Sequence, residues 1–124
     1  SVEQVKDLHQ LHFIDQARPL LILGKPGTGK SHLAISLGIT ACHHQYSVRF
    51  FTAQKLAKLL YASLADESTD RLLTKLARTD LLIIDDLGYM RCGPEHATLF
   101  FELICSRYEK KACIITSNII SNNF

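Results

Sequence analysis

Residues 19–34 read PLLILGKPGTGKSHLA, and this stretch decides the fold. An apolar run ends at Gly24, a glycine-rich segment follows, and the chain then continues with helical periodicity. This order of strand, loop and helix is the context in which the pattern G-x-x-x-x-G-K-[ST] holds phosphate. The stretch therefore predicts a buried strand, a phosphate-binding loop, and a helix from Lys30 to about His43.

The loop also predicts which groups would contact a nucleotide. Its glycines let successive backbone N–H groups converge on phosphate, and the helix N-terminus adds its dipole. Lys30 would place a positive charge on the β- and γ-phosphates, and the Ser31 hydroxyl would coordinate Mg²⁺. The predicted nucleotide-binding residues are Gly24, Lys25, Pro26, Gly27, Thr28, Gly29, Lys30, Ser31 and His32.

The rest of the chain alternates between strand-like and helix-like patterns, as a parallel α/β sheet requires. The run 81–84 is apolar on both faces and is predicted to be a central strand. The fold class is therefore a three-layer α/β P-loop fold with a central parallel sheet, in one domain over residues 1–124. Residues 1–18 form a lead-in segment, and the sheet is expected to be truncated, because a P-loop sheet usually has at least five strands. Further strands are predicted at 47–52 and 112–116, and further helices at about 53–64, at 70–78 and from Pro94. The core stripe of the helix at 53–64 is predicted to consist of Leu56, Leu59, Leu60 and Leu64.

Two predicted strands end in side chains that could serve hydrolysis. Asp85 and Asp86 follow the third strand, and Asn118 closes the fourth. In a parallel sheet these ends open onto the same edge as the phosphate loop. Asp85 would hold Mg²⁺, Asp86 would orient or deprotonate the attacking water, and Asn118 would contact the γ-phosphate or that water. The predicted catalytic residues are Lys30, Asp86 and Asn118. The alternative is that the acids cap a loop and that the asparagine is a turn residue.

A basic stripe lies on the helix predicted at 70–78. Arg71, Lys75 and Arg78 recur at helical spacing opposite leucines, and Lys55 and Lys58 lie away from the apolar stripe of the preceding helix. Such a stripe is usually a solvated face. Contact with the phosphates of DNA is the alternative interpretation.

The composition limits the class of protein. In 124 residues, 47% are hydrophobic and 21% charged, which is typical of a folded soluble domain. A net charge of +2 permits contact with nucleic acid without arguing for it. No apolar run approaches the roughly 18 residues of a membrane span. The four cysteines form no C-x-x-C pair, which favours a reduced, cytoplasmic protein.

Four segments together resemble the IstB family of AAA+ ATPases, which assist transposition of insertion sequences and are related to the DnaC helicase loaders. The segments are GKPGTGKSHLA at 24–34, DLLIIDDLGY at 80–89, FELICSRYE at 101–109 and IITSN at 114–118. The resemblance covers nearly the whole chain from about Leu11 onward. Its most particular part is the Gly-Tyr pair after the two acids.

The resemblance implies an ATP-driven assembly on DNA, as a ring or helical oligomer, that recruits or activates a transposase. Lys30 and Ser31 would take the Walker A roles, Asp85 and Asp86 the Walker B roles, and Asn118 that of the first sensor. The region between the second and third strands would face the central channel and contact DNA. Lys25 and Ser31 stand where the family usually carries Pro and Thr. The resemblance also implies that the family's fifth strand, its lid and the arginine that reaches a neighbour's ATP would lie beyond Phe124. The absence of a guanine signature N-K-x-D favours ATP as the nucleotide.

The alternative to a transposition helper is a helicase-loader fragment, or a nucleotide-dependent switch with little ATPase activity.

Overall fold

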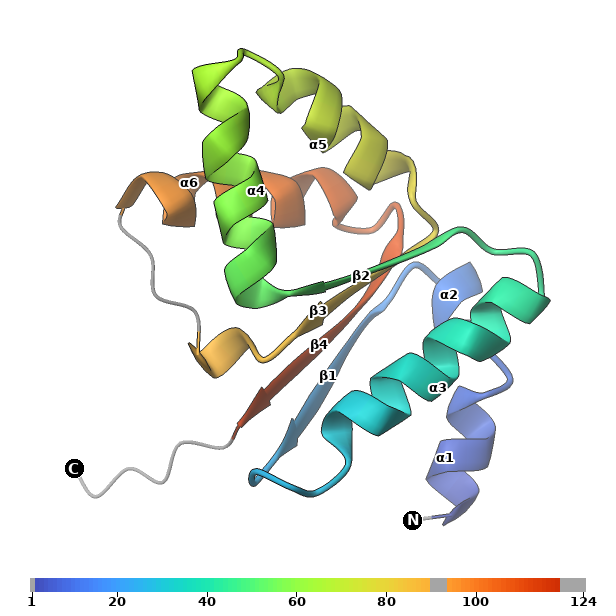
Figure 1. Ribbon diagram of the computed structural model, residues 1–124. Helices are drawn as coiled ribbons and strands as arrows, with labels where there is room; N and C mark the ends of the chain where they lie inside the picture. Colours follow the sequence, from blue (N-terminus) through green and yellow to red (C-terminus); the bar gives the residue numbers. More distant parts are fainter. Residues whose placement is uncertain (1, 90–93, 119–124) are drawn as a thin grey trace.

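The computed structural model describes residues 2–89 and 94–118, and its centre is a parallel sheet of four strands. The strand order is β1-β4-β3-β2, and each neighbouring pair runs parallel (Figure 1). The predicted parallel α/β sheet is therefore confirmed. The strands are β1 (Pro19–Gly24), β2 (Val48–Thr52), β3 (Leu81–Asp85) and β4 (Ala112–Asn118).

Helices cover both faces of this sheet and complete the three layers (Figure 1). One face carries α1 (Val2–Leu8), α2 (His12–Asp15) and α3 (Lys30–His43). The other carries α4 (Ala53–Ala65), α5 (Thr69–Arg78) and α6 (Pro94–Arg107), and a short 3₁₀ turn, η1 (Leu87–Tyr89), follows β3. None of the helices in the described ranges is long and apolar enough to cross a membrane.

The central strand β3 divides the core in two. All five of its residues are buried, as the sequence predicts. Leu82 and Ile84 belong to the cluster beneath α4, α5 and α6, whereas Leu81 and Ile83 belong to the cluster beneath α3. Because successive side chains of a strand point to opposite faces, a strand that is covered on both sides must be apolar throughout.

The prediction that β1 is a buried strand is wrong for one of its faces. Leu20 and Ile22 pack into the α3 cluster, but Leu21 and Leu23 are 57% and 54% exposed. Within the described sheet β1 pairs only with β4, so it is an edge strand. Leu21 lies opposite Ile115 in register, but only Ile115 packs against the cluster beneath α4, α5 and α6.

The core stripe predicted for α4 is also partly wrong. Leu59 and Leu64 are 40% and 47% exposed, although both were expected on the stripe with Leu56 and Leu60. Small residues replace them at the contact with the sheet, because alanine lets a helix approach closely. The buried residues of α4 are Ala53, Leu56, Ala57, Leu60 and Ser63.

Two features seat α3 firmly on the sheet. The lead-in segment, for which the sequence predicts no structure, forms α1 and α2, and it buries Leu11 and Ile14 in the α3 cluster. On the sheet side, a Cβ added at Gly38 would lie 2.9 Å from Ile83 Cδ1. Glycine at this position therefore allows α3 to lie close against β3.

Candidate functional site

The segment between β1 and α3 forms a tight loop whose shape depends on glycine. Gly27 and Gly29 have φ angles of +79° and +85°, a region that L side chains rarely adopt. Gly24 is needed for a different reason, because a Cβ there would lie 2.7 Å from Thr28 Oγ1 and 3.3 Å from Lys30 Cδ. The glycines predicted from the motif are thus explained by two distinct constraints.

One backbone carbonyl organises the inside of the loop. The carbonyl of Lys25 accepts hydrogen bonds from Thr28 Oγ1 at 2.8 Å and from Lys30 Nζ at 2.9 Å. The Lys30 side chain is only 9% exposed, whereas the Lys25 side chain is exposed. The loop therefore holds one of its two ammonium groups in a fixed place and leaves the other in solvent.

The first turn of α3 and the end of β3 meet at a hydroxyl–carboxylate contact. Ser31 Oγ lies 2.9 Å from each carboxylate oxygen of Asp85 and donates its hydrogen bond to that group. Asp85 is 5% exposed. The two residues predicted to hold Mg²⁺ are thus brought together, although they lie far apart in the sequence.

The remaining predicted catalytic residues face a pocket beside this contact. The pocket has a volume of about 300 Å³, and Lys30, Asp86 and Asn118 all line it. His32, which the motif adds to the nucleotide-binding set, lines it as well. Asp85 is not among the lining residues and reaches the pocket through Ser31. The full lining is Pro26, Gly27, Gly29, Lys30, Ser31, His32, Asp86 and Asn118.

Thr116 in β4 is the residue at this site that the sequence analysis does not identify. Its side chain is fully buried, and its hydroxyl donates a hydrogen bond to Asp85 Oδ1. The hydroxyl oxygen of Thr116 also accepts a hydrogen bond from the backbone N–H of Asp86 at 3.0 Å. The available clue is a single hydroxyl at the end of the apolar run 112–115. A threonine in a strand is ordinarily explained by its β-branched shape, so this clue is weak.

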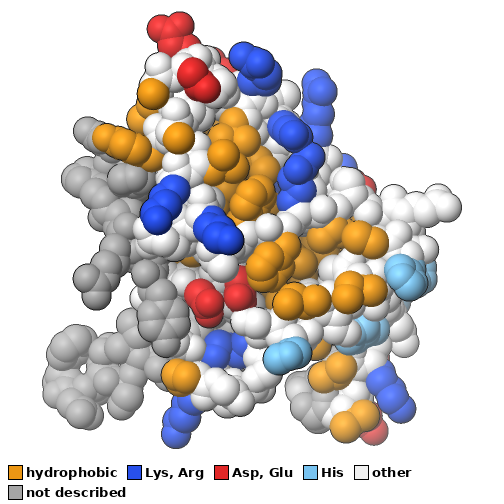
Figure 2. Space-filling view, viewed as in Figure 1, with side chains coloured by type: hydrophobic (Ala, Val, Ile, Leu, Met, Phe, Trp, Pro, Cys, Tyr) orange, Lys and Arg blue, Asp and Glu red, His pale blue; other side chains and the backbone are white. Residues whose placement is uncertain are grey.

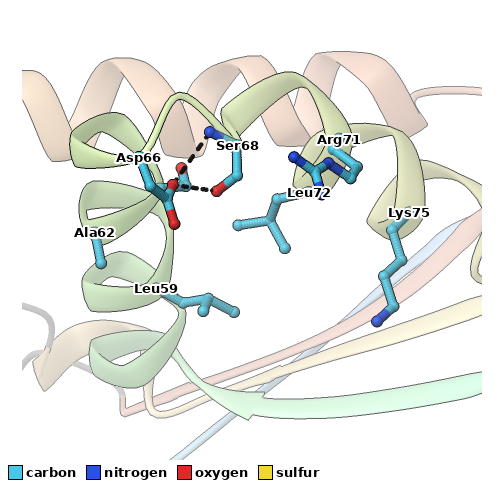
Figure 3. Close-up of a pocket in the computed structure, with 8 residues that line it drawn as sticks. Leu59, Ala62, Asp66, Ser68, Arg71, Leu72 and Lys75 are labelled. Carbon is cyan, nitrogen blue, oxygen red and sulfur yellow. Dashed lines mark hydrogen bonds between the residues drawn. The ribbon is translucent and has the colours of Figure 1, made fainter.

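The predicted basic residues separate into two groups. Arg71 and Lys75 line a groove between α4 and α5 whose floor includes Leu59 and Leu72 (Figure 3). Figure 2 shows basic side chains beside the apolar patch over these two helices. The groove and the pocket at the phosphate loop share no lining residue.

Arg78 belongs to the same surface as Arg71 and Lys75, whereas Lys55 and Lys58 of α4 do not. Arg78 lines a shallow depression together with Arg71 and Lys75, so the three side chains predicted at helical spacing do form one surface. We call Arg71, Lys75 and Arg78 the α5 basic surface. Lys55 and Lys58 are exposed on α4 but line neither hollow.

At the opposite end of the sheet, polar contacts join the strands. Asp80 accepts the backbone N–H of Ser47 and a 2.9 Å hydrogen bond from Lys111 Nζ, and these contacts hold the pKa of its carboxyl below the usual range. Arg107 is 2% exposed and donates to the carbonyls of Leu76 and Ala112, and burial lowers the pKa of its guanidinium. These residues brace the sheet far from the pocket.

Known proteins are similar to this chain in sequence. The chain is 38% identical over 117 residues to the insertion sequence IS232 putative ATP-binding protein of Bacillus thuringiensis subsp. berliner, covering 94% of this chain and 47% of the relative. It is 38% identical over 114 residues to the IS21 putative ATP-binding protein of Pseudomonas aeruginosa, covering 92% and 43%. The chain therefore spans less than half the length of these relatives.

Solved structures are similar to this chain in fold. The replication initiator DnaA, bound to AMPPCP and single-stranded DNA, matches with a TM-score of 0.79 and 25% identity over 93% of this chain and 36% of that one. The DnaC helicase loader matches in fold, with a TM-score of 0.82 and 23% identity over 98% of this chain and 70% of that one. The fold is thus the α/β P-loop fold of the AAA+ type. The model of the family described as IstB-like ATP binding protein matches residues 1–123, so the chain belongs to that family.

Proposed function

We propose that this chain is the ATP-binding core of a transposition helper ATPase, which binds ATP with Mg²⁺ and, in the whole protein, hydrolyses it while assembling on DNA. One observation carries the proposal: Ser31 Oγ lies 2.9 Å from both carboxylate oxygens of Asp85. Hydroxyl and carboxylate oxygens are the ligands that Mg²⁺ takes in nucleotide sites of this class.

The loop fits the phosphates of a nucleotide. Its left-handed glycines, Gly27 and Gly29, turn the backbone so that N–H groups can face one centre, and α3 begins immediately afterwards. Lys30 is held beside that backbone by the carbonyl of Lys25. In the proposed complex the backbone binds phosphate oxygens and Lys30 neutralises the β- and γ-phosphates.

The strand ends supply the groups for hydrolysis. Mg²⁺, held by Ser31 and Asp85, would neutralise charge on the phosphates. Asp86 lines the pocket from the neighbouring position and would accept a proton from, or orient, the attacking water. Asn118 lines the same pocket from the end of β4 and would donate a hydrogen bond to the γ-phosphate or to the water.

Lys30→Ala tests nucleotide binding, with Lys25→Ala as the matched control. Removing the Lys30 charge deletes a charge-assisted contact of about 1.5–3 kcal/mol, so ATP should bind at least about tenfold more weakly. Lys25 lies in the same loop, but its side chain is exposed, and its removal should change affinity by less than about threefold. Calorimetric titration with ATP measures both. Equal losses in the two variants, or no loss in Lys30→Ala, would contradict the assignment of the loop.

Hydrolysis is tested at the acidic pair in the whole protein. Asp86→Asn should spare ATP binding and abolish turnover, whereas Asp85→Asn should also weaken the dependence on Mg²⁺. Turnover is measured with and without DNA. If the parent protein binds ATP and never turns it over, the switch alternative holds; if both variants hydrolyse at the parental rate, the acids only cap a loop.

The DNA interaction is proposed for the α5 basic surface. Its three side chains are exposed and line one shallow depression, and two of them, Arg71 and Lys75, also line the α4–α5 groove (Figure 3). Spaced cations of this kind bind backbone phosphates without reading bases. The DnaA structure of matching fold is bound to single-stranded DNA, which supports DNA as the partner class. Lys55 and Lys58 are proposed only as secondary contacts.

Charge reversal tests this surface. Changing Arg71, Lys75 and Arg78 together to Glu should weaken binding to every DNA sequence and reduce the salt slope by roughly 3, since each lost phosphate contact removes about one unit. Reversal of three exposed cations elsewhere, Lys6, Arg18 and Lys110, changes net charge equally and is the matched control. DNA titrations at several salt concentrations decide. Identical effects of the two triple variants would mean that only net charge matters.

Partners and location belong to the same proposal. The relatives are named as insertion sequence proteins, which supports a transposase as partner. Assembly of several copies on DNA is proposed with it, as the resemblance to the AAA+ ATPases of the IstB family implies. The cysteines that the structure describes, Cys42, Cys105 and Cys113, are free thiols, in keeping with a reduced cytoplasm. Sedimentation of the whole protein with ATP and DNA, with and without its transposase, measures both kinds of assembly.

A further inference from the structure

A single buried hydroxyl contacts both acids of the candidate site. Thr116 lies in β4 and is 0% exposed. Its Oγ1 donates to Asp85 Oδ1 and accepts the Asp86 backbone N–H at 3.0 Å. Donor and acceptor capacity of the hydroxyl are thus both used, and both are used on consecutive acidic residues.

The Asp85 contact fixes how that carboxylate faces the phosphate loop. Its Oδ1 accepts from both Thr116 and Ser31, whereas Oδ2 accepts from Ser31. A carboxylate can otherwise rotate about its last bond with little cost. With Thr116 behind it and Ser31 in front, the group presents both oxygens to the first turn of α3.

The Asp86 contact holds a backbone conformation that needs support. Asp86 has a φ of +60°, which lies in the left-handed region that residues other than glycine adopt less readily. The hydrogen bond from its N–H to Thr116 offsets part of the cost of that conformation. Next to it, Gly88 packs closely on β4, since an added Cβ would lie 3.2 Å from Ser117 Oγ. The turn after β3 is thus fastened to the end of β4.

We propose that Thr116 is a positioning residue, whose hydroxyl orients Asp85 toward the metal ion and holds the left-handed turn that directs Asp86 into the pocket. This inference rests on the proposed ATP site, but it concerns the nucleotide-free geometry as well. Two residues of β4 then have different roles. Asn118 lines the pocket, whereas Thr116, two residues earlier, positions Asp85 and Asp86 through its hydrogen bonds.

The test compares Thr116→Val, which keeps the shape and removes the hydroxyl, with Thr116→Ser, which keeps the hydroxyl. Thr79→Val is the matched control, because Thr79 is 5% exposed, precedes the start of β3, and donates its hydroxyl hydrogen bond to the Lys75 carbonyl in α5. Two quantities are measured: the exchange rate of the Asp86 amide proton without nucleotide, and ATP affinity with Mg²⁺ and with EDTA.

In Thr116→Val the Asp86 amide should exchange at least about tenfold faster, because its hydrogen bond is lost. The gain in ATP affinity that Mg²⁺ provides should shrink about tenfold, while affinity in EDTA stays within about threefold. Thr116→Ser should restore both quantities, and Thr79→Val should alter neither.

The inference is overturned if Thr116→Val keeps slow exchange and the full effect of Mg²⁺, or if Thr116→Ser fails to restore them. Failure of the proposed function looks different: the unaltered protein itself would gain no ATP affinity from Mg²⁺. In that case the exchange rates alone decide whether Thr116 holds the turn. Faster exchange of the Asp86 amide in Thr116→Val alone would support this role of Thr116, and equal rates in Thr116→Val and the unaltered protein would refute it.

Discussion

Replacing Gly24 by alanine is expected to disturb the phosphate loop through one identifiable contact. The new Cβ would lie 2.7 Å from Thr28 Oγ1, closer than such atoms approach in proteins, and 3.3 Å from Lys30 Cδ. The threonine side chain can rotate away, but it then loses its 2.8 Å hydrogen bond to the Lys25 carbonyl. Lys30 must also shift by a few tenths of an ångström.

The magnitude follows from those two adjustments. A lost neutral hydrogen bond costs about 0.5–1.5 kcal/mol, and the displaced Lys30 stem adds a few tenths. The total destabilises the phosphate-binding conformation of the loop by about 1–2 kcal/mol. Under the proposed function, ATP should therefore bind about 5–30-fold more weakly to Gly24→Ala.

A double-mutant cycle isolates the contact. Thr28→Ala removes the atom that collides, so Gly24→Ala should cost little in its presence, and the coupling energy should be about 1 kcal/mol. Gly29→Ala provides the control, because its expected loss comes from a φ of +85° and its Cβ would meet no atom within 4 Å. Thr28→Ala should not rescue it. ATP titration of the six proteins gives the result, and strict additivity of Gly24→Ala with Thr28→Ala would refute the reasoning.

Three further predictions concern other contacts. Arg107→Met removes two buried donors from backbone carbonyls, so the free energy of unfolding in urea should fall by about 2–4 kcal/mol; a loss under about 0.5 kcal/mol would show that the guanidinium contributes little. Because the pKa of Asp80 is lowered on folding, its contribution is present above the unfolded value of about 3.9 and disappears as pH falls through the folded value. Urea denaturation should thus show Asp80→Asn less stable than the parent near pH 6, with the difference shrinking as pH falls below about 4, and a difference independent of pH would exclude the charge of the carboxylate, with its contacts to the Ser47 N–H and to Lys111, as its source. Ser31→Ala should lower ATP affinity about tenfold with Mg²⁺ and hardly at all with EDTA, and equal losses in both buffers would place the hydroxyl outside the metal site.

The sequence predicts the parts of this protein that depend on local pattern. The bounds of α3, the burial of β3 and the strand–loop–helix order at the phosphate loop all follow from periodicity and glycine placement. The meeting of Ser31 and Asp85 was also predictable, because parallel strands end at a common edge.

What the sequence does not show depends on neighbours in space. The exposure of Leu21 follows from the edge position of β1, and no local pattern states which strand lies at an edge. Leu59 satisfies helical spacing as well as Leu56 does, but the structure buries Leu56 in the core together with Ala53 and leaves Leu59 exposed. Thr116 and Arg107 are buried polar residues whose hydrogen bonds reach distant segments of the chain.

The edge position of β1 has a practical consequence for work with this segment. Within the described sheet, one side of β1 has no neighbouring strand, and Leu21 and Leu23 stand beside that side with more than half of each side chain exposed. Unpaired backbone groups next to apolar side chains are a template for adding a further strand, and another molecule can supply it. Preparations of residues 1–124 alone are therefore expected to self-associate as concentration rises. A lysine at Leu21 should keep them monomeric without touching the phosphate loop.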